Sequence, residues 1–517
     1  MLKGKFVAHV LLSVFLIMVT VLSGCANKDS TKGTKESAVP ASPIATAAVE
    51  TAKPLEPVVL TYYYPGVVQK DVQEVNDAMN VILKKKINAT IKLVTIDFGN
   101  YDQKMNVLNA AGESYDLAFT ANWINNYYQN VSKGNFIAID DLLSKYAPKL
   151  KASIPDSVWQ ASKINGKTYG AINLQIYAMP YGYVVRKDLL DKYKFDINSV
   201  NKAEDLEPLM KQIKEKEQGI TPLAVDAIYS WLPLMFGYEG IGDTKLPGVV
   251  KLENPDYKVI NQYESPEFTN YVKLMKKWND AGYFNKDAIS VKDIRPDFKA
   301  GKYAIFLGQG VKPGVEAENK AFYGQDLVSK TTTKAYVTTG GIVATMTGVS
   351  KTSKNPERAM MYLELINTDK ELYNLISHGI EGKHYKVVDK EKGVIGTPDG
   401  MDPKQIGYNP STDWMFGNQF NSYYLDAASV GNWEKTAKLN ATGIVSPILG
   451  FNFDAAPINT ESAQVNAVIG EMASALITGT IDPDKYLPIF HEKLKKAGVD
   501  KIIAEKQKQL DAWKKTK

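Results

Sequence analysis

The sequence predicts an α/β protein in which mainly parallel sheets are flanked by helices. Strand-like and helix-like segments alternate from residue 58 onward, and such alternation favours parallel strands joined by right-handed helical crossovers. The 517 residues are 44% hydrophobic and 23% charged, which is typical of globular domains and enough for two or more of them. The chain has 1 cysteine, so no internal disulfide can form and a packed core must supply the stability.

The first residues have the pattern of a secretion signal. Lys3 and Lys5 form a basic start, and residues 6–22 form a short apolar run that ends in small residues. The following Leu22-Ser23-Gly24-Cys25 resembles the bacterial lipobox, in which the cysteine is lipidated before cleavage. We therefore expect a signal peptide over 1–24 and a lipid anchor on Cys25. No other stretch is long and apolar enough to span a bilayer.

Residues 25–57 form the predicted tether. After Cys25 the composition shifts to Lys, Ser, Thr, Ala and Pro with hardly any large apolar residue. Such a segment cannot bury enough apolar surface to order itself. Its r.m.s. span would be about 30 Å, so a folded body could move above the membrane to which it is anchored.

The folded body begins with a predicted β-α-β-α-β run. Its five segments are a strand at 58–63, a helix at 67–86, a strand at 89–96, a helix at 101–111 and a strand at 115–119. Ligands of open α/β sheets collect at the carboxyl ends of the strands. Those ends carry 62–66, which reads Tyr-Tyr-Tyr-Pro-Gly, and 120–123, which reads Thr-Ala-Asn-Trp. The sequence thus predicts an aromatic and amide-rich ligand site at this edge.

Further helices follow from apolar spacing and from helix start signals. Ser265 and Asn355 each precede a proline, which is favoured at the first helical position. The predicted helices are 140–146, 186–193, 203–218, 265–280, 355–367 and 463–477, with a helical tail over 485–513 that breaks near Gly498.

Several sequence patches, in a consistent order, carry a family resemblance. They are 115–118 (YDLA), 164–170 (INGKTYG), 183–190 (YVVRKDLL), 298–305 (FKAGKYAI), and 340–341 (GG) through 350–357 (SKTSKNPE). Together with the lipobox and the tether, they resemble the extracellular solute-binding proteins of ABC importers, in the sugar-binding group that includes maltodextrin binders. Ala171-Ile172-Asn173 replaces the proline that usually follows the second patch. The tail from Gly450 resembles a C-terminal region of unassigned function in Gram-positive lipoproteins of this class.

The resemblance implies a two-lobed, periplasmic-binding-protein-like fold with the ligand cleft between the lobes. Lobe 1 would take 58–172 and 340–390, and lobe 2 would take 173–339 and 391–517, including a helical C-terminal region over 450–517. Closure of the hinge would bury a small-molecule solute, which we expect to be an oligosaccharide. The expected partners are the ABC permease subunits, and the expected state is a monomer on the outer face of a Gram-positive cytoplasmic membrane.

The candidate ligand-binding residues combine ring faces with polar groups. A sugar has apolar ring faces and many hydroxyls, and a buried hydroxyl left unpaired costs about 1–3 kcal/mol. The candidates are Tyr63, Tyr64, Asn122, Trp123, Tyr177, Trp231, Gln309, Gly341, Trp414 and Trp433. Some are placed by the strand ends and others by the resemblance, while Trp414 and Trp433 are placed by an aromatic, Asn-rich stretch of sequence. Three further tryptophans, Trp159, Trp278 and Trp513, are predicted to lie in the core.

Catalysis is not expected, and neither is a cofactor or a metal. The 4 histidines show no zinc-ligand spacing, and no nucleophile elbow or phosphate-binding glycine loop is present. The net charge of +5 is small and its signs are mixed, which gives no reason to expect nucleic acid. Paired carboxylates can be brought together by folding alone. A lipid-anchored glycosidase or lyase is therefore an alternative function, as is a surface adhesion lipoprotein.

Overall fold

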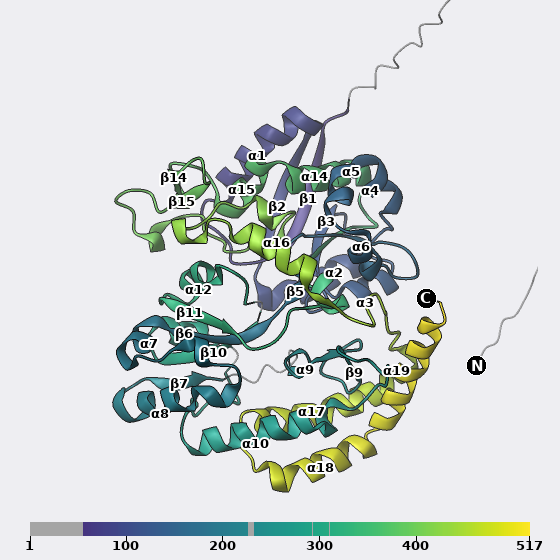
Figure 1. The fold of residues 1–517 in the computed structure, drawn as a ribbon. Coiled ribbons are helices and arrows are strands. Elements are labelled where there is room, and N and C mark those ends of the chain that lie inside the picture. The colour runs from purple at the N-terminus through teal and green to yellow at the C-terminus, as the bar shows by residue number, and fades with distance from the viewer. Residues whose placement is uncertain (1–54, 226–231, 292, 310, 517) are drawn as a thin grey trace, which may run out of the picture. The chain divides into compact units, whose positions relative to one another are not determined.

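The first sheet has five strands in the order β2-β1-β3-β13-β4, of which β1, β2 and β3 are labelled in Figure 1. The computed structural model describes residues 55–225, 232–291, 293–309 and 311–516. The strands are β1 (Val58–Pro65), β2 (Ala89–Ile96), β3 (Leu117–Thr120), β4 (Gly170–Ile172) and β13 (Met346–Val349). β1 pairs in parallel with both β2 and β3, as the β-α-β-α-β pattern predicts. β13 enters from much later in the chain and runs antiparallel to β3 and β4.

The two crossover helices follow from local signals. In α1 (Val72–Ile87), Val75, Met79 and Leu83 recur four residues apart and are fully buried against the first core. The helix starts five residues later than predicted, and Val67 and Val68 stay exposed. α2 (Phe98–Ala111) starts three residues earlier than predicted, because the Asp97 side chain caps it by accepting a hydrogen bond from the Gly99 amide.

The second sheet has four strands in the order β11-β6-β10-β7. They are β6 (Tyr181–Arg186), β7 (Thr221–Ala224), β10 (Tyr303–Gln309) and β11 (Leu327–Thr331). β10 is parallel to β7, but β6 is antiparallel to both β10 and β11, so this sheet is mixed and not mainly parallel as predicted. The core beside it takes side chains from α7 (Lys187–Tyr193), α8 (Glu207–Lys216) and α10 (Pro266–Asp280). Trp278 is fully buried there, which confirms its predicted core role.

Short strands lie where the chain passes from one sheet to the other. β5 (Ala178–Met179), β12 (Tyr336–Val337) and β16 (Ile444–Val445) form a three-stranded sheet in the order β16-β12-β5. β5 precedes the first strand of the second sheet, and β12 precedes the return to the first sheet. We call the parts built on the two large sheets the first and the second lobe. The three short strands are thus the crossing segments that a hinge requires.

Further elements complete the described chain. The helices are α3 (Tyr127–Ser132), α4 (Asp140–Tyr146), α5 (Pro148–Ser153), α6 (Asp156–Ser162), α9 (Leu232–Met235), α11 (Arg295–Lys299), α12 (Val315–Tyr323), α13 (Thr339–Ile342), α14 (Pro356–Thr368), α15 (Lys370–His378) and α16 (Asn432–Thr442). Two hairpins are β8 (Tyr238–Gly240) with β9 (Val249–Lys251) and β14 (Lys386–Asp389) with β15 (Val394–Gly396). The predicted helices are all present, the one at 203–218 beginning as a 3₁₀ turn (Ala203–Leu206) before α8.

The predicted helix starts differ in how they are capped. Ser265 accepts a hydrogen bond from the Phe268 amide through its hydroxyl at 3.1 Å, as an N-cap does. Asn355 makes no such side-chain bond at the start of α14, although a proline follows it as well. The fixed φ of Pro356 is the start signal at this position.

The segment after β15 packs with the first lobe. Tyr408, Met415 and Phe416 belong to the core around β1, and the Phe416 ring lies 5.9 Å from Tyr62 and 5.0 Å from Tyr64. This packing differs from the predicted division, which gives 391–517 to the second lobe. No periodic pattern marks this irregular segment, so its long-range aromatic contacts are not visible in the sequence.

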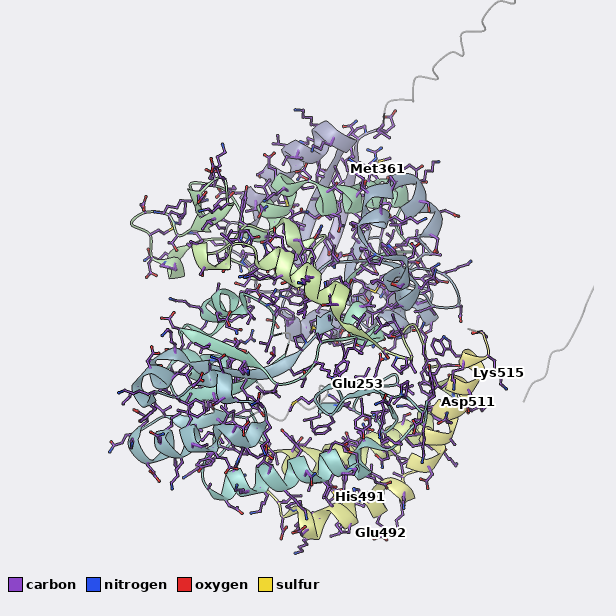
Figure 2. All side chains as sticks on the ribbon, in the orientation of Figure 1. Glu253, Met361, His491, Glu492, Asp511 and Lys515 are labelled. Carbon is purple, nitrogen blue, oxygen red and sulfur yellow. The ribbon has the colours of Figure 1, made fainter. Side chains whose placement is uncertain are left out.

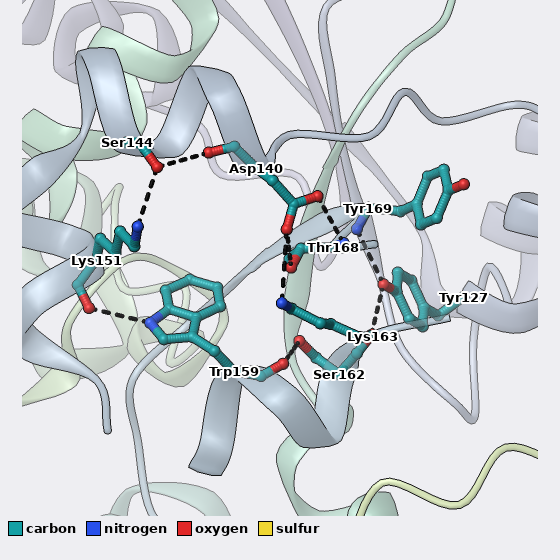
Figure 3. A network of polar contacts seen from close by, with 9 residues as sticks. All are labelled: Tyr127, Asp140, Ser144, Lys151, Trp159, Ser162, Lys163, Thr168 and Tyr169. Atoms are coloured by element: carbon teal, nitrogen blue, oxygen red, sulfur yellow. Dashed lines mark hydrogen bonds and ion pairs between the residues drawn. The ribbon is translucent and has the colours of Figure 1, made fainter. Parts of the chain in front are cut away.

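A polar network holds the connection into β4 (Figure 3). The Thr168 amide and hydroxyl donate to the two carboxylate oxygens of Asp140, at 3.0 and 3.1 Å. Tyr127, the first residue of α3, donates to the Ser162 carbonyl at 2.9 Å and accepts from the Tyr169 amide at 3.2 Å. α3 is thereby fixed to the predicted turn at 164–170. The buried Trp159 donates to the Lys151 carbonyl, which confirms its core assignment.

Three helices form the C-terminal region and pack on the second lobe. They are α17 (Asn459–Ile477), α18 (Pro483–Lys496) and α19 (Val499–Lys514), and α18 and α19 separate at Gly498, whose φ is +96°. Their apolar faces share a core with Phe268 and Val272 of α10. In Figure 2, His491 lies along α18, where its Nε2 is 2.7 Å from the Tyr263 carbonyl oxygen.

Candidate functional site

Three aromatic rings meet at the carboxyl edge of the first sheet. Phe98 follows β2, Trp123 follows β3, and Trp414 lies in a 3₁₀ turn, Asp413–Met415. The ring centroids of Trp123 and Phe98 are 6.5 Å apart with planes 21° from parallel, and those of Trp123 and Trp414 are 6.2 Å apart. Trp123 is 50% exposed and Phe98 is 39% exposed, which is unusual for large aromatic side chains. We call these three rings the aromatic platform.

Two side chains at the platform, Trp123 and Asn122, are fixed by hydrogen bonds to α13 and to the residues just after it. The Trp123 indole nitrogen donates to the Ala344 carbonyl at 2.9 Å, and the Asn122 amide group donates to the Gly340 carbonyl at 3.2 Å. Both acceptors lie in or just after α13, which follows the crossing strand β12. A displacement of α13 is therefore expected to move Asn122 and Trp123 as well.

Trp414 is held from the opposite side. Its ring lies 6.1 Å from the buried Phe119 of β3 in an edge-on arrangement. The Tyr373 hydroxyl donates to the Asp413 carbonyl at 2.9 Å, and the Asn173 amide group donates to the Met415 carbonyl at 2.6 Å. The platform rings are therefore held in place before any ligand binds, which lowers the entropy cost of binding.

A buried carboxylate lies at the start of α13. The Thr339 amide donates to Glu239 Oε1 at 3.0 Å, and the side chain of Glu239 is nearly inaccessible to solvent. Burial raises the pKa of Glu239 to about 7, although hydrogen bonds from Ser446 and from the α13 backbone oppose the shift. This group links β8 of the second lobe to the segment that holds Trp123.

A side pocket adjoins the platform. It has a volume of about 200 Å³, and the Trp123 ring forms part of its wall. Helices α2 and α3 and the loop between Trp123 and Asn126 supply the rest of the lining. Among the described residues, no group of three or more His, Cys, Asp or Glu side chains is arranged to hold a metal ion.

Comparison with known proteins decides the family. A carbohydrate ABC transporter substrate-binding protein of Streptococcus pneumoniae is 30% identical over 470 residues, covering 89% of this chain and 91% of the relative. The chain belongs to the carbohydrate ABC transporter substrate-binding proteins. The predicted function, as the solute-binding component of a carbohydrate importer, is thereby confirmed.

Solved structures confirm the predicted two-lobed fold of this substrate-binding protein. The crystal structure of the N-glycan transport solute binding protein NgtS from S. pneumoniae has a TM-score of 0.79 and 28% identity, covering 88% of this chain and 99% of NgtS. For NgtS in complex with Man5GlcNAc the TM-score is 0.73, at 89% and 99% coverage. Lipoprotein LipO of Bacillus subtilis is 21% identical over 473 residues, covering 84% of this chain and 88% of LipO.

The C-terminal region of the substrate-binding protein is a family of its own. Residues 447–515 match a domain of unknown function, DUF3502. This match agrees with the C-terminal region of unassigned function that the sequence predicts from Gly450. It includes α17, α18 and α19, which pack on the second lobe.

The predicted site residues of the substrate-binding protein fall into several environments. Asn122, Trp123 and Trp414 come together at the platform. Tyr64 is buried beside Phe416, and burial raises its pKa; Tyr63 packs edge-on against Tyr115 at 5.8 Å. Neither tyrosine makes a ring contact with the platform among the described residues. Their alternate directions follow the pleat of β1.

Two other predicted residues pack against each other near the crossing segment. A side chain at Gly341 would meet the Tyr177 carbonyl oxygen at 2.8 Å, so the backbone approach requires glycine. The Tyr177 amide donates to the Asn440 side chain at 2.9 Å, which ties β5 to α16. This close approach packs α13 against the segment that leads into β5.

The remaining predictions lie in the second lobe, in α16 or outside the described residues. Gln309 ends β10 with its backbone opposite Tyr181. Trp433 stacks on Tyr424 at 6.1 Å with planes 20° apart, and Lys312 Nζ lies 5.1 Å from its ring centroid. Trp231 and Cys25 lie outside the described residues.

Sequence reasoning missed one ring and several polar groups of the site. Phe98 directly follows the helix cap Asp97 at the end of β2, and this cap is the signal that could have placed the ring at the strand ends. The polar residues of the side pocket lie on α2, on α3 and next to the ends of α3, and have no signal in the sequence, because only the folded chain brings these segments together.

Proposed function

We propose that this substrate-binding protein captures an N-glycan-type oligosaccharide on the aromatic platform and delivers it to its permease. The observation that carries the proposal is the grouping of Phe98, Trp123 and Trp414 at the strand ends. Exposed rings offer flat apolar faces that fit the apolar faces of pyranose rings. The relatives of this fold include NgtS, whose structures contain Man1GlcNAc and Man5GlcNAc.

Of the predicted site residues, Asn122, Trp123 and Trp414 are proposed as direct ligand contacts. Trp231 and Gln309 are proposed as contacts from the second lobe when the hinge closes. Trp433, Tyr177 and Gly341 are proposed to support the site, and Tyr63 and Tyr64 to support the strand beneath it. The proposed lobes are those predicted from the sequence, with 403–421 transferred to the first lobe because Tyr408, Met415 and Phe416 pack there.

The protein is further proposed to act as a monomer tethered through Cys25 to the outer face of a Gram-positive cytoplasmic membrane. The lipobox at 22–25 and the similarity to lipoprotein LipO support this anchor. No helix in the described part of the chain is long and apolar enough to cross a membrane. Mass spectrometry of the membrane-bound protein tests the anchor: an unmodified Cys25 in the isolated protein would contradict it.

Binding without cleavage is the proposed outcome for the captured glycan. The relatives are solute-binding proteins, and capture for transport requires that the oligosaccharide leaves intact. The test incubates the purified protein with Man5GlcNAc and records both the melting curve and the released products. At about 100 times Kd, a ligand that binds only the folded state adds about 2.7 kcal/mol of stability. Cleavage products would contradict the proposal.

Substitution of the platform tests which residues carry the binding. Trp414→Ala removes one ring face, and we expect the Kd for Man5GlcNAc to rise about tenfold in calorimetric titration. About 60 Å² of apolar contact between ring and sugar, at about 25 cal/mol per Å², contributes about 1.5 kcal/mol. Ile489→Ala, an exposed position on α18, is the control and should bind as the parent does. Parent-like affinity of Trp414→Ala would mean that the glycan binds elsewhere.

A further inference from the structure

The side pocket next to Trp123 is lined almost entirely by polar side chains, several of them exposed to solvent. It is lined by Asp102, Asn106, Trp123, Ile124, Asn125, Asn126, Gln129, Asn130 and Lys133. The side chains of Asn106, Gln129 and Lys133 are exposed to solvent, and no other protein group of the described chain occupies them, so all three are accessible to a ligand in the pocket. Asp102 accepts from the Asn125 amide through one carboxylate oxygen, and its second oxygen has no partner there.

The asparagine side chains at the floor of the pocket make hydrogen bonds within the fold. Asn125 and Asn130 are 5% and 6% exposed. The Asn125 amide group donates to the Phe119 carbonyl at 2.8 Å, and the Asn130 amide group donates to Asn125 Oδ1 at 2.9 Å. The Asn126 side chain caps α3 by accepting from the Gln129 amide at 3.1 Å. These three asparagines are therefore held by bonds within the fold.

The volume and the charge of the pocket restrict its occupant. About 200 Å³ is below the about 300–1,000 Å³ of pockets that hold whole drug-sized ligands, so one ring-sized unit is the appropriate occupant. Asp102 and Lys133 carry opposite charges, and they form no ion pair in the described structure. Together with two side-chain amides they offer both donors and acceptors with no net charge, which suits neutral hydroxyls better than a carboxylate group.

We propose that this side pocket is a subsite for one neutral pyranose unit of the oligosaccharide. The Trp123 ring forms a wall of the pocket and also belongs to the platform, so a glycan can place one unit on the platform and an adjoining unit in the pocket. This inference rests on the proposed function of the platform. It adds that Asp102, Asn106, Gln129 and Lys133 determine specificity for a neutral glycan of at least two units.

The test uses the detergent-purified full-length protein and calorimetric titration with Man1GlcNAc and Man5GlcNAc. We expect the double variant Asn106→Ala/Gln129→Ala to bind at least one of these glycans at least tenfold more weakly than the parent. Gln103→Ala, on the same helix but outside the pocket lining, is the matched control and should bind within twofold of the parent. Equal urea midpoints for parent and variants establish that the fold is intact. Asp102→Asn, which keeps the shape of the side chain, is the second pocket variant and is tested for the same loss of binding.

The outcomes separate this inference from the proposed function. If both pocket variants bind both glycans as the parent does while Trp414→Ala weakens binding, the subsite is wrong and the platform stands. If the parent binds neither these glycans nor any other in a panel, the proposed function is wrong and the subsite falls with it. Stronger binding of a galacturonate trimer than of Man5GlcNAc, lost in Asp102→Asn or in the double variant, would overturn the neutral specificity.

Discussion

At the residue scale, the buried Glu239 is expected to make the stability of the fold depend on pH. Its carboxylate is buried at the start of α13, and burial raises its pKa from 4.5 to about 7. A raised carboxyl pKa means that the folded state holds its proton more tightly than the unfolded state. The stabilisation is therefore complete below about pH 4.5 and is lost as the pH rises through about 7.

Substitution of this residue gives a prediction for stability against pH. In the parent, this one group should lower the free energy of unfolding by up to about 3 kcal/mol between pH 4.5 and 8. Glu239→Gln keeps an acceptor for the Thr339 amide but cannot ionise. The free energy of unfolding of this variant should therefore fall by up to about 3 kcal/mol less than that of the parent over the same pH range. Urea denaturation at pH 5 and pH 8 measures the difference, with the exposed Glu264→Gln as the control. Equal declines in parent and Glu239→Gln would show that the carboxylate is not responsible.

At the element scale, α13 connects the segment that leads into β5 with the aromatic platform. It accepts a bond from Asn122 within the helix, and Ala344, just after its end, accepts one from Trp123. Tyr177 of the segment leading into β5 leaves no space for a side chain at Gly341. The helix therefore occupies a narrow position between β5 and the platform, and displacing it should disturb both.

Gly341→Ala tests this role of α13. The added carbon would lie 2.8 Å from the Tyr177 carbonyl oxygen, so the backbone has to shift, at a cost of about 1–3 kcal/mol. We expect a lower urea midpoint together with a Kd for Man5GlcNAc raised about tenfold. Gly470→Ala in α17 has open space around it and should leave binding unchanged. A destabilised Gly341→Ala variant with parent-like affinity would show that α13 does not position the platform.

The elements also show what local sequence signals determine. The β-α-β-α-β run and the helices at 140–146 and 265–280 follow from periodicity and start signals, and the structure has them within a few residues. The start of α2 was misplaced because the Asp97 cap was not recognised. The antiparallel insertion of β13 between β3 and β4 depends on pairing between distant segments, for which the sequence carries no local signal.

At the scale of the whole molecule, the site is assembled from segments far apart in the chain. Trp123 was predicted from its place at a strand end, and Trp414 from an aromatic, Asn-rich composition. Their contact at 6.2 Å arises because the irregular segment around Phe416 packs into the first core. Composition could indicate the types of residue in the site, but only the fold shows which rings meet.

The central claim is that the platform of Phe98, Trp123 and Trp414 holds a sugar ring of the transported glycan. A crystal structure of the protein with Man5GlcNAc tests it most directly. The account predicts a pyranose ring lying against the face of Trp123 or Trp414, with both lobes in contact with the glycan. A bound glycan that leaves these rings exposed to solvent would contradict it.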